Sequence, residues 1–113
     1  MRPENPYYRT RRTAEFSARD LLIRKGYGVI RVAQSHTNES TGINLVAWDK
    51  DGKVLFIYAR SRGRSPISDD IRALSNLTSI CHFPGNVQYW IQDKTGWIRY
   101  QINPGGALPL PVL

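Results

Sequence analysis

The sequence has a single cysteine and no long hydrophobic run, and each shortage excludes a class of protein. Cys81 has no second cysteine to pair with, so an internally disulfide-bonded fold is excluded and a reducing environment is expected. No apolar stretch approaches the roughly 20 residues that a transmembrane helix needs. Residues 1–6 lack the apolar segment of a secretory signal. We therefore expect a cytoplasmic protein without a membrane partner.

Acidic residues are also scarce, at 9 against 16 lysines and arginines, which gives a net charge of +7 at pH 7. The excess is concentrated in two places. Residues 1–31 hold eight basic and three acidic groups, and Arg60, Arg62 and Arg64 add three positive charges. Twelve of the basic residues are arginine, whose forked guanidinium suits phosphate. This pattern favours nucleic acid as partner, DNA more than RNA, although a basic balance can also merely keep a protein soluble.

The length of 113 residues predicts one domain with a single core. We expect this domain over residues 10–103. Residues 1–9 are polar, basic and interrupted by proline, and predict an arm that could wrap a nucleic-acid backbone or simply be a disordered start. Residues 104–113 are rich in proline, glycine and apolar side chains, so they predict neither a regular helix nor an inner strand. Such an apolar tail could pack on a second subunit.

Residues 43–62 carry the clearest structural signal. Two apolar runs, rich in β-branched and aromatic residues, flank a polar segment with Asp51-Gly52, which predicts a β-hairpin. Both runs are apolar at nearly every position, as in strands that are covered on both faces. Because side chains alternate along a strand, Asn44 on the first run and Tyr58 with Arg60 on the second interrupt this apolar surface at places that could be neighbours.

Hydrophobic spacing predicts two helices. The first runs from about Thr10 to Lys25 and ends at Gly26, where a left-handed residue is favoured. The second begins after Ser68 as its N-cap and includes Cys81, which we expect in the core. Three further strands are expected at residues 28–34, 86–92 and 97–102.

This succession of a helix bearing Glu15, a strand, a hairpin and a second helix resembles the PD-(D/E)xK nuclease superfamily, and most closely the archaeal Holliday-junction resolvases. In those nucleases a hairpin aspartate and glutamate bind a divalent metal, a lysine positions or activates water, and a first-helix glutamate completes the site. The matching hairpin positions here are Asn44, Tyr58 and Arg60. The resemblance covers roughly residues 10–102. It implies an α/β, restriction endonuclease-like core of order α-β-β-β-α-β-β, with a mixed central sheet flanked by helices, and a homodimer.

The residue types at the matched positions speak against metal-dependent cleavage. Mg²⁺ is usually bound by one or two carboxylates, whereas Asn44 and Tyr58 are neutral. Arg60 keeps its proton below about pH 12 and cannot replace lysine in a proton transfer. We therefore expect no intact catalytic residue, no metal ligand and no cofactor. The former site would then hold phosphate or be purely structural, and Mg²⁺ would be required only by an active nuclease.

Eight residues are candidates for contact with nucleic acid. The resemblance implies Ser35, because a serine after the first strand lies near the scissile phosphate in the resolvases, and the others are arginines of the two basic segments. The candidates are Arg9, Arg11, Arg12, Arg19, Ser35, Arg60, Arg62 and Arg64.

Three functions remain open at this point. The first is an inactive resolvase-like module that binds branched or duplex DNA. The second is an active Mg²⁺-dependent endonuclease that uses Glu15 with Glu39 or His36. The third is a non-catalytic interaction or regulatory subunit that engages a protein through its tail. Glu15 could equally form only a surface ion pair with Arg19, one helical turn away.

Overall fold

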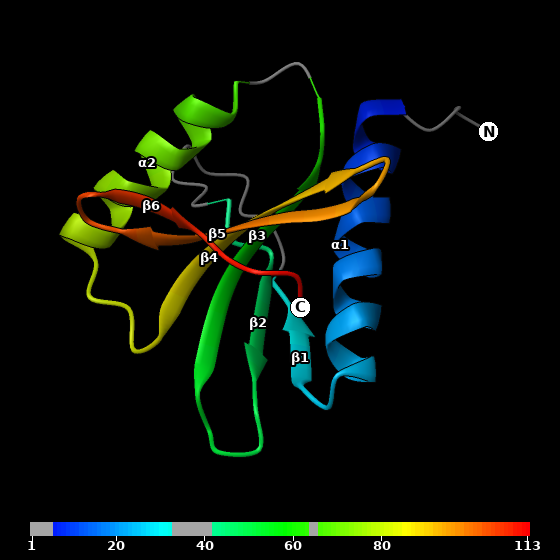
Figure 1. Cartoon of the computed structure of the whole chain (residues 1–113), viewed down its shortest axis with the longest axis horizontal. Coiled ribbons are helices and arrows are strands. Elements are labelled where there is room, and N and C mark those ends of the chain that lie inside the picture. Colours follow the sequence, from blue (N-terminus) through cyan, green and yellow to red (C-terminus); the bar gives the residue numbers. More distant parts are fainter. Residues whose placement is uncertain (1–5, 33–41, 64–65) are drawn as a thin grey trace.

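The chain forms a six-stranded mixed sheet with one helix on each face (Figure 1). The computed structural model describes residues 6–32, 42–63 and 66–113, with side chains from residue 13 onward. The elements are α1 (Pro6–Arg24), β1 (Gly28–Arg31), β2 (Leu45–Trp48), β3 (Val54–Ser61), α2 (Ile67–Ile80), β4 (Asn86–Asp93), β5 (Gly96–Asn103) and β6 (Gly106–Pro109). The predicted α/β class, with a mixed sheet flanked by helices, is confirmed.

The order of elements is α-β-β-β-α-β-β-β, one strand longer than predicted. The restriction endonuclease-like assignment therefore remains a prediction. Neither described helix is long and apolar enough to cross a membrane.

Strand order in the sheet equals strand order in the chain, from β1 at one edge to β6 at the other. All neighbouring strands are antiparallel except β3 and β4, which are parallel and are joined through α2. β2 and β3 lie inside the sheet, as the apolar character of residues 43–62 predicts. Their turn is held by Asp49, whose Oδ1 accepts from the backbone N–H of Asp51 and of Lys53, both at 2.9 Å.

Helix α1 packs against the sheet through three side chains at four-residue spacing, Ala14, Ala18 and Leu22, all with 0% exposure. Gly26 ends the helix with a φ of 91°. The N–H of Gly26 donates to the Ile23 carbonyl and that of Tyr27 to the Leu22 carbonyl, a Schellman arrangement that satisfies the last carbonyls. The predicted helix end is therefore confirmed.

The start of α1 differs from the prediction. We expected an arm over residues 1–9 and a helix from about Thr10, but the helix already begins at Pro6. Proline is tolerated in the first turn of a helix, where its missing N–H has no partner to lose. Of the expected arm, residues 6–9 thus belong to α1, and residues 1–5 lie outside the described residues.

The sheet separates two hydrophobic clusters. The α1-side core comprises Ala18, Leu22, Leu45, Ala47, Leu55, Ile57, Ala59 and Trp90. The α2-side core comprises Ile43, Leu74, Val87, Tyr89, Ile91 and Ile102, with Phe56 and Tyr58 packed against it. Successive residues of β3 alternate between the two cores, because strand side chains point to opposite faces.

The tail that we predicted over residues 104–113 forms part of the sheet instead of a free segment. Pro104-Gly105 make a tight turn, and β6 then pairs with β5 as an edge strand. Beyond β6, the carbonyl of Pro111 accepts a 2.7 Å hydrogen bond from Arg99, and Leu113 packs against the α1-side core. Burial lowers the pKa of Arg99, although Tyr27 partly offsets this. The tail therefore covers a buried guanidinium of its own chain.

Three local predictions were wrong. The N-cap of α2 is Pro66, without a side-chain hydrogen bond, rather than Ser68. Cys81 is the C-cap residue of α2 and is exposed, because the helix ends at Ile80 before Cys81 can turn toward the core. The first strand ends at Arg31 and does not include Val32, while residues 33–34 of the expected strand lie outside the described residues.

Candidate functional site

Arg60, which the resemblance matches to the nuclease lysine, is buried and bound within the protein. Its side chain leaves β3 on the α2 side, and its NH1 donates to Oδ2 of Asp70 at 2.5 Å. The same Asp70 oxygen accepts from the hydroxyl of Tyr89 at 2.5 Å. Nε of Arg60 donates to the carbonyl of Ser61 at 3.0 Å. Arg60 is only 8% exposed. Because Arg60 and Tyr89 both bind Asp70, the network joins β3 and β4 to the first turn of α2.

The charges of this network are fixed by its contacts. Burial alone would lower the pKa of Arg60, but the hydrogen bond to Asp70 and the surrounding charges outweigh it and raise the pKa. Burial and the hydrogen bond to Asp70 also raise the pKa of Tyr89. Arg60 is therefore a cation and Tyr89 a neutral donor at physiological pH, and Asp70 satisfies both.

Asn44, which the resemblance matches to the metal-binding aspartate, hydrogen-bonds to the backbone of β3. Its Nδ2 donates to the carbonyl of Ala59 at 2.8 Å, and its Oδ1 accepts from the N–H of Ala59 at 3.0 Å. Its own N–H donates to the Ile57 carbonyl at 3.0 Å. Asn44 is 3% exposed. Its side chain thus continues the β2–β3 ladder, and a carboxylate could not make the same pair of bonds because it has no donor.

Tyr58, which the resemblance matches to the glutamate, packs beside the α2-side core. Its ring centroid lies 5.5 Å from that of Tyr89. Gly42 also lies against the ring, since a Cβ added there would come within 2.8 Å of it. The ring is therefore half-buried, in contact with Tyr89 and with the backbone of Gly42.

Glu15, the fourth matched position, lies on the other side of the sheet. Its Oε1 accepts a 2.9 Å hydrogen bond from Nε of Arg31. Arg31 is paired in register with Leu45, a residue of the α1-side core. Glu15 is therefore on the α1 side, whereas Tyr58 and Arg60 are on the α2 side. The structure does not bring these positions together, and the partner of Glu15 is Arg31 rather than the predicted Arg19.

The other residues of the active-nuclease alternative, His36 and Glu39, lie outside the described residues. Among those that the structure describes, no three histidine, cysteine, aspartate or glutamate side chains group in a way that could hold a metal ion.

The structure places the candidate nucleic-acid-binding arginines in different settings. Arg60 is neutralised by Asp70, and Arg62 forms an ion pair with Asp93 at 3.0 Å. Arg19 lies on α1, forms an ion pair with Asp20 at 3.3 Å, and has a side chain that is 36% exposed. The structure describes the backbone of Arg9, Arg11 and Arg12 as part of α1, but not their side chains. Ser35 and Arg64 lie outside the described residues altogether.

Sequence reasoning missed a cluster of cationic side chains around one aromatic ring. The guanidinium carbon of Arg31 lies 4.3 Å from the centroid of the Phe16 ring, and that of Arg19 lies 4.9 Å from it. We call Glu15, Phe16, Arg19 and Arg31 the Phe16 cluster. The only sequence signal for this cluster was the basic excess of residues 1–31, because Arg31 reaches the Phe16 ring only through the packing of β1 against α1.

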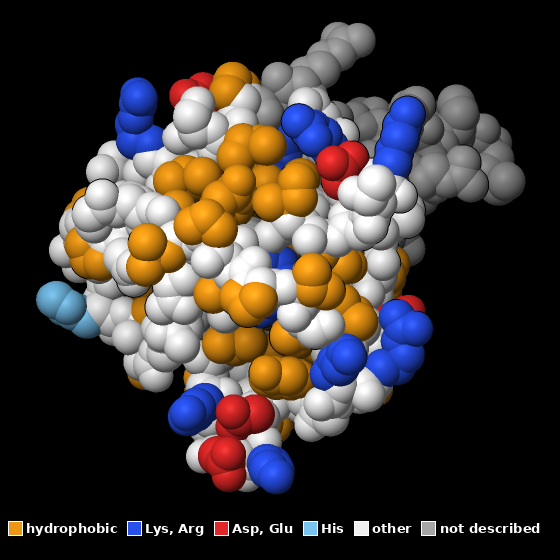
Figure 2. Space-filling model, in the orientation of Figure 1, with side chains coloured by type: hydrophobic (Ala, Val, Ile, Leu, Met, Phe, Trp, Pro, Cys, Tyr) orange, Lys and Arg blue, Asp and Glu red, His pale blue; other side chains and the backbone are white. Residues whose placement is uncertain are grey.

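The positive charge is concentrated in α1 and β1. Residues 6–31 contain seven basic and two acidic side chains. Residues 42–63 and 66–113 together contain seven basic and five acidic ones. Two of those seven basic side chains, Arg60 and Arg99, are buried. On the face shown in Figure 2, hydrophobic side chains occupy the centre, and lysine and arginine lie toward the margin.

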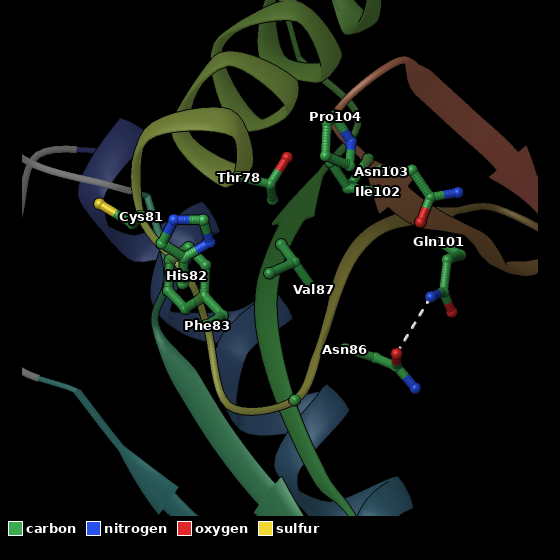
Figure 3. Close-up of a pocket in the computed structure, with 11 residues that line it drawn as sticks. Thr78, Cys81, His82, Phe83, Asn86, Val87, Gln101, Ile102, Asn103 and Pro104 are labelled. Carbon is green, nitrogen blue, oxygen red and sulfur yellow. Dashed lines mark hydrogen bonds between the residues drawn. The ribbon is translucent and has the colours of Figure 1, made fainter.

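A small cavity of about 240 Å³ lies beyond the C-terminal end of α2 (Figure 3). Asn86 and Gln101 stand together at one side, joined by a 3.1 Å hydrogen bond, while His82 and Phe83 come from the segment after α2. No lysine or arginine is among its lining residues. It therefore offers a phosphate no fixed positive charge.

Comparisons of the chain with protein-family profiles and with curated protein sequences gave no match. The likeness to the resolvases therefore rests on the matched positions and on the order of elements.

Proposed function

We propose that this protein binds nucleic acid, with branched or duplex DNA as the preferred partner, on a resolvase-like nuclease fold that has lost metal-dependent cleavage. The observation that carries the proposal is the network of Arg60, Asp70 and Tyr89. At the position where the nuclease lysine would serve the reaction, a buried guanidinium is instead bound to a carboxylate of α2. Homodimerisation and a cytoplasmic location, which the sequence led us to expect, belong to the same proposal.

Loss of cleavage follows from the chemistry at the matched positions. Metal-assisted hydrolysis of a phosphodiester needs a cation that holds a phosphate oxygen and lowers the pKa of a water. Here the oxygen of Asn44 already accepts from Ala59, and the carboxylate of Asp70 already accepts from Arg60 and Tyr89. Glu15 lies across the sheet with Arg31. A divalent ion would thus meet one occupied neutral oxygen and a carboxylate whose charge Arg60 balances.

Nucleic-acid binding is supported by the charge of α1 and β1. Seven basic side chains against two acidic ones over residues 6–31 give a positive segment on one layer of the molecule. Phosphate contacts made by arginine and lysine supply most of the sequence-independent affinity of DNA-binding proteins. This layer is therefore where we expect a duplex or a junction to bind.

The test is the binding of a labelled four-way junction and of the matching linear duplex in EDTA across a series of salt concentrations. Each phosphate neutralised adds about 0.9 to the slope of log affinity against log salt for duplex DNA. We expect tighter binding to the junction and a slope that corresponds to several contacts. Weak binding that is equal for both substrates would contradict the proposal.

A parallel arm replaces EDTA with Mg²⁺ or Mn²⁺ and follows cleavage of the same substrates. We expect none. Metal-dependent cleavage that is abolished by Glu15→Ala would establish the active-nuclease alternative instead.

A further inference from the structure

We propose that the outer surface formed by α1 and β1 at the Phe16 cluster is the site that holds the nucleic-acid backbone, with Arg19 and Arg31 as its phosphate ligands. This inference rests on the proposed function and states where on the molecule the nucleic acid binds. It moves the contact away from Arg60, Arg62 and Arg64, the segment next to the former nuclease site.

The first argument is the arrangement of the two guanidinium groups. Both lie against the ring of Phe16, at 4.3 and 4.9 Å from its centroid. A ring in this position fixes two flexible cationic side chains side by side through cation–π attraction. Their side chains remain 40% (Arg31) and 36% (Arg19) exposed. Two arginines that are already oriented lose less conformational freedom when they bind neighbouring phosphates.

The second argument is that both arginines have donors to spare. Arg19 uses one N–H of NH2 for Oδ1 of Asp20, at 3.3 Å. Arg31 uses its Nε–H for Glu15, and an arginine carries five N–H donors in all. Both guanidinium groups can therefore form forked hydrogen bonds to phosphate oxygens without breaking the cluster.

The third argument is the balance of charge in the two basic segments. Arg60 is buried against Asp70, which leaves its guanidinium little access to a phosphate. Arg19 and Arg31 also have acidic partners, at 3.3 and 2.9 Å, but their side chains stay 36% and 40% exposed. Residues 6–31 carry seven basic and two acidic side chains, whereas residues 42–63 carry four basic and two acidic ones. The ion pairs therefore leave the larger positive excess on α1 and β1.

The length of α1 suits a backbone contact. Its 19 residues span about 28 Å at 1.5 Å per residue, which equals about eight base pairs of duplex at 3.4 Å each. A duplex or a junction arm laid along the helix would place several phosphates within reach of its arginines.

Glu15 opposes the binding of a phosphate at this site. Its carboxylate accepts from Arg31 and would repel a phosphate that approaches the same guanidinium. Glu15→Gln should therefore release Arg31 for the nucleic acid. We therefore expect the Glu15→Gln variant to bind nucleic acid more tightly than the natural protein.

The experiment compares variants of the full chain on the linear duplex in EDTA over a series of salt concentrations. The double variant Arg19→Gln, Arg31→Gln should lower the salt slope by about 2, the loss of two phosphate contacts. The matched control is Arg72→Gln with Lys53→Gln, which removes two exposed charges from α2 and from the β2–β3 turn. The control should leave the slope unchanged. Thermal unfolding of each variant shows that it is folded.

The outcomes separate this inference from the function on which it rests. If both double variants lower the slope equally, binding is spread over the surface and the assignment to the Phe16 cluster is wrong, while nucleic-acid binding stands. If the unaltered protein does not bind the duplex, both the proposed function and its assignment to the Phe16 cluster are wrong. Tighter binding of the duplex by Glu15→Gln than by the unaltered protein, at each salt concentration, would support Arg31 as a ligand. Unchanged or weaker binding would overturn that role.

Discussion

Asp70 should be among the most costly single side chains of this protein to remove. Arg60 and Tyr89 donate to one oxygen of Asp70, both at 2.5 Å, from β3 and β4 respectively. Asp70→Ala leaves a buried guanidinium and a buried hydroxyl without their acceptor. Asp69→Ala is the matched control, because Asp69 is the neighbouring aspartate in the same helical turn and is exposed.

The size of the effect follows from the burial of the partners. Removing one member of a buried ion pair costs about 3–5 kcal/mol. The side chain of Asp70 is 20% exposed and that of Arg60 only 9%, so water can replace part of the lost contact. We therefore expect a loss near the lower end, about 3 kcal/mol. For a domain of 113 residues this corresponds to a fall in Tm of about 12 °C.

The assay is urea unfolding followed by circular dichroism, with calorimetry for Tm. Asp69→Ala should cost less than about 1 kcal/mol, the contribution of an acidic side chain to the helix dipole. Replacing the ion pair with apolar residues, Arg60→Met with Asp70→Leu, should be milder than Asp70→Ala because no charge is then left unpaired. Equal effects of the two alanine substitutions would refute the reasoning, because the network would then contribute nothing beyond the helix dipole.

Three further changes test other contacts. Asn44→Asp removes the donor to a backbone carbonyl and should cost about 2 kcal/mol in urea unfolding, while exposed Asn76→Asp should stay within about 0.5 kcal/mol. Above pH 10 stability should fall, because an unfolded tyrosine loses its proton near its ordinary pKa of 10.0 while folded Tyr89, with its raised pKa, retains it. Tyr89→Phe should remove that part of the pH dependence and lower stability at pH 7 by about 2 kcal/mol. Deletion of residues 110–113 removes the shorter of two hydrogen bonds of buried Arg99, that to Pro111, and should cost about 2 kcal/mol, with a red shift of tryptophan fluorescence as the readout.

Local signals in the sequence predicted most of the architecture. The 3.6-residue spacing of Ala14, Ala18 and Leu22 and the β-branched runs around Asp51-Gly52 are short-range patterns that mark a helix and a hairpin. Elements near proline were harder to predict. Pro6 was taken as a break but opens a helix, and Pro109 was taken as part of a tail but ends an edge strand, where its missing N–H does no harm.

The candidate site was less predictable because its contacts join distant segments. In the sequence, Asp70 is only one of two acidic residues in the first turn of a helix, whereas in the structure it pairs with Arg60 through the packing of α2 on β3. Likewise, Glu15 pairs with Arg31, sixteen residues away, and not with the arginine one turn along its helix. No periodicity encodes such pairings, because they depend on which face of the sheet each helix covers.

The agreement between strand order and chain order has a consequence for how fast this protein folds. Most of its strand pairs are formed by neighbours joined by tight turns, so closing them costs little loop entropy. The β1–β2 pair closes a longer segment, residues 32–44, and the parallel seam between β3 and β4 must wait for α2 to form or to dock. Two three-stranded hairpin units can therefore assemble separately and meet along that seam. Such a chain, with contacts mostly between nearby segments, should fold faster than a sheet protein of equal size with shuffled strands.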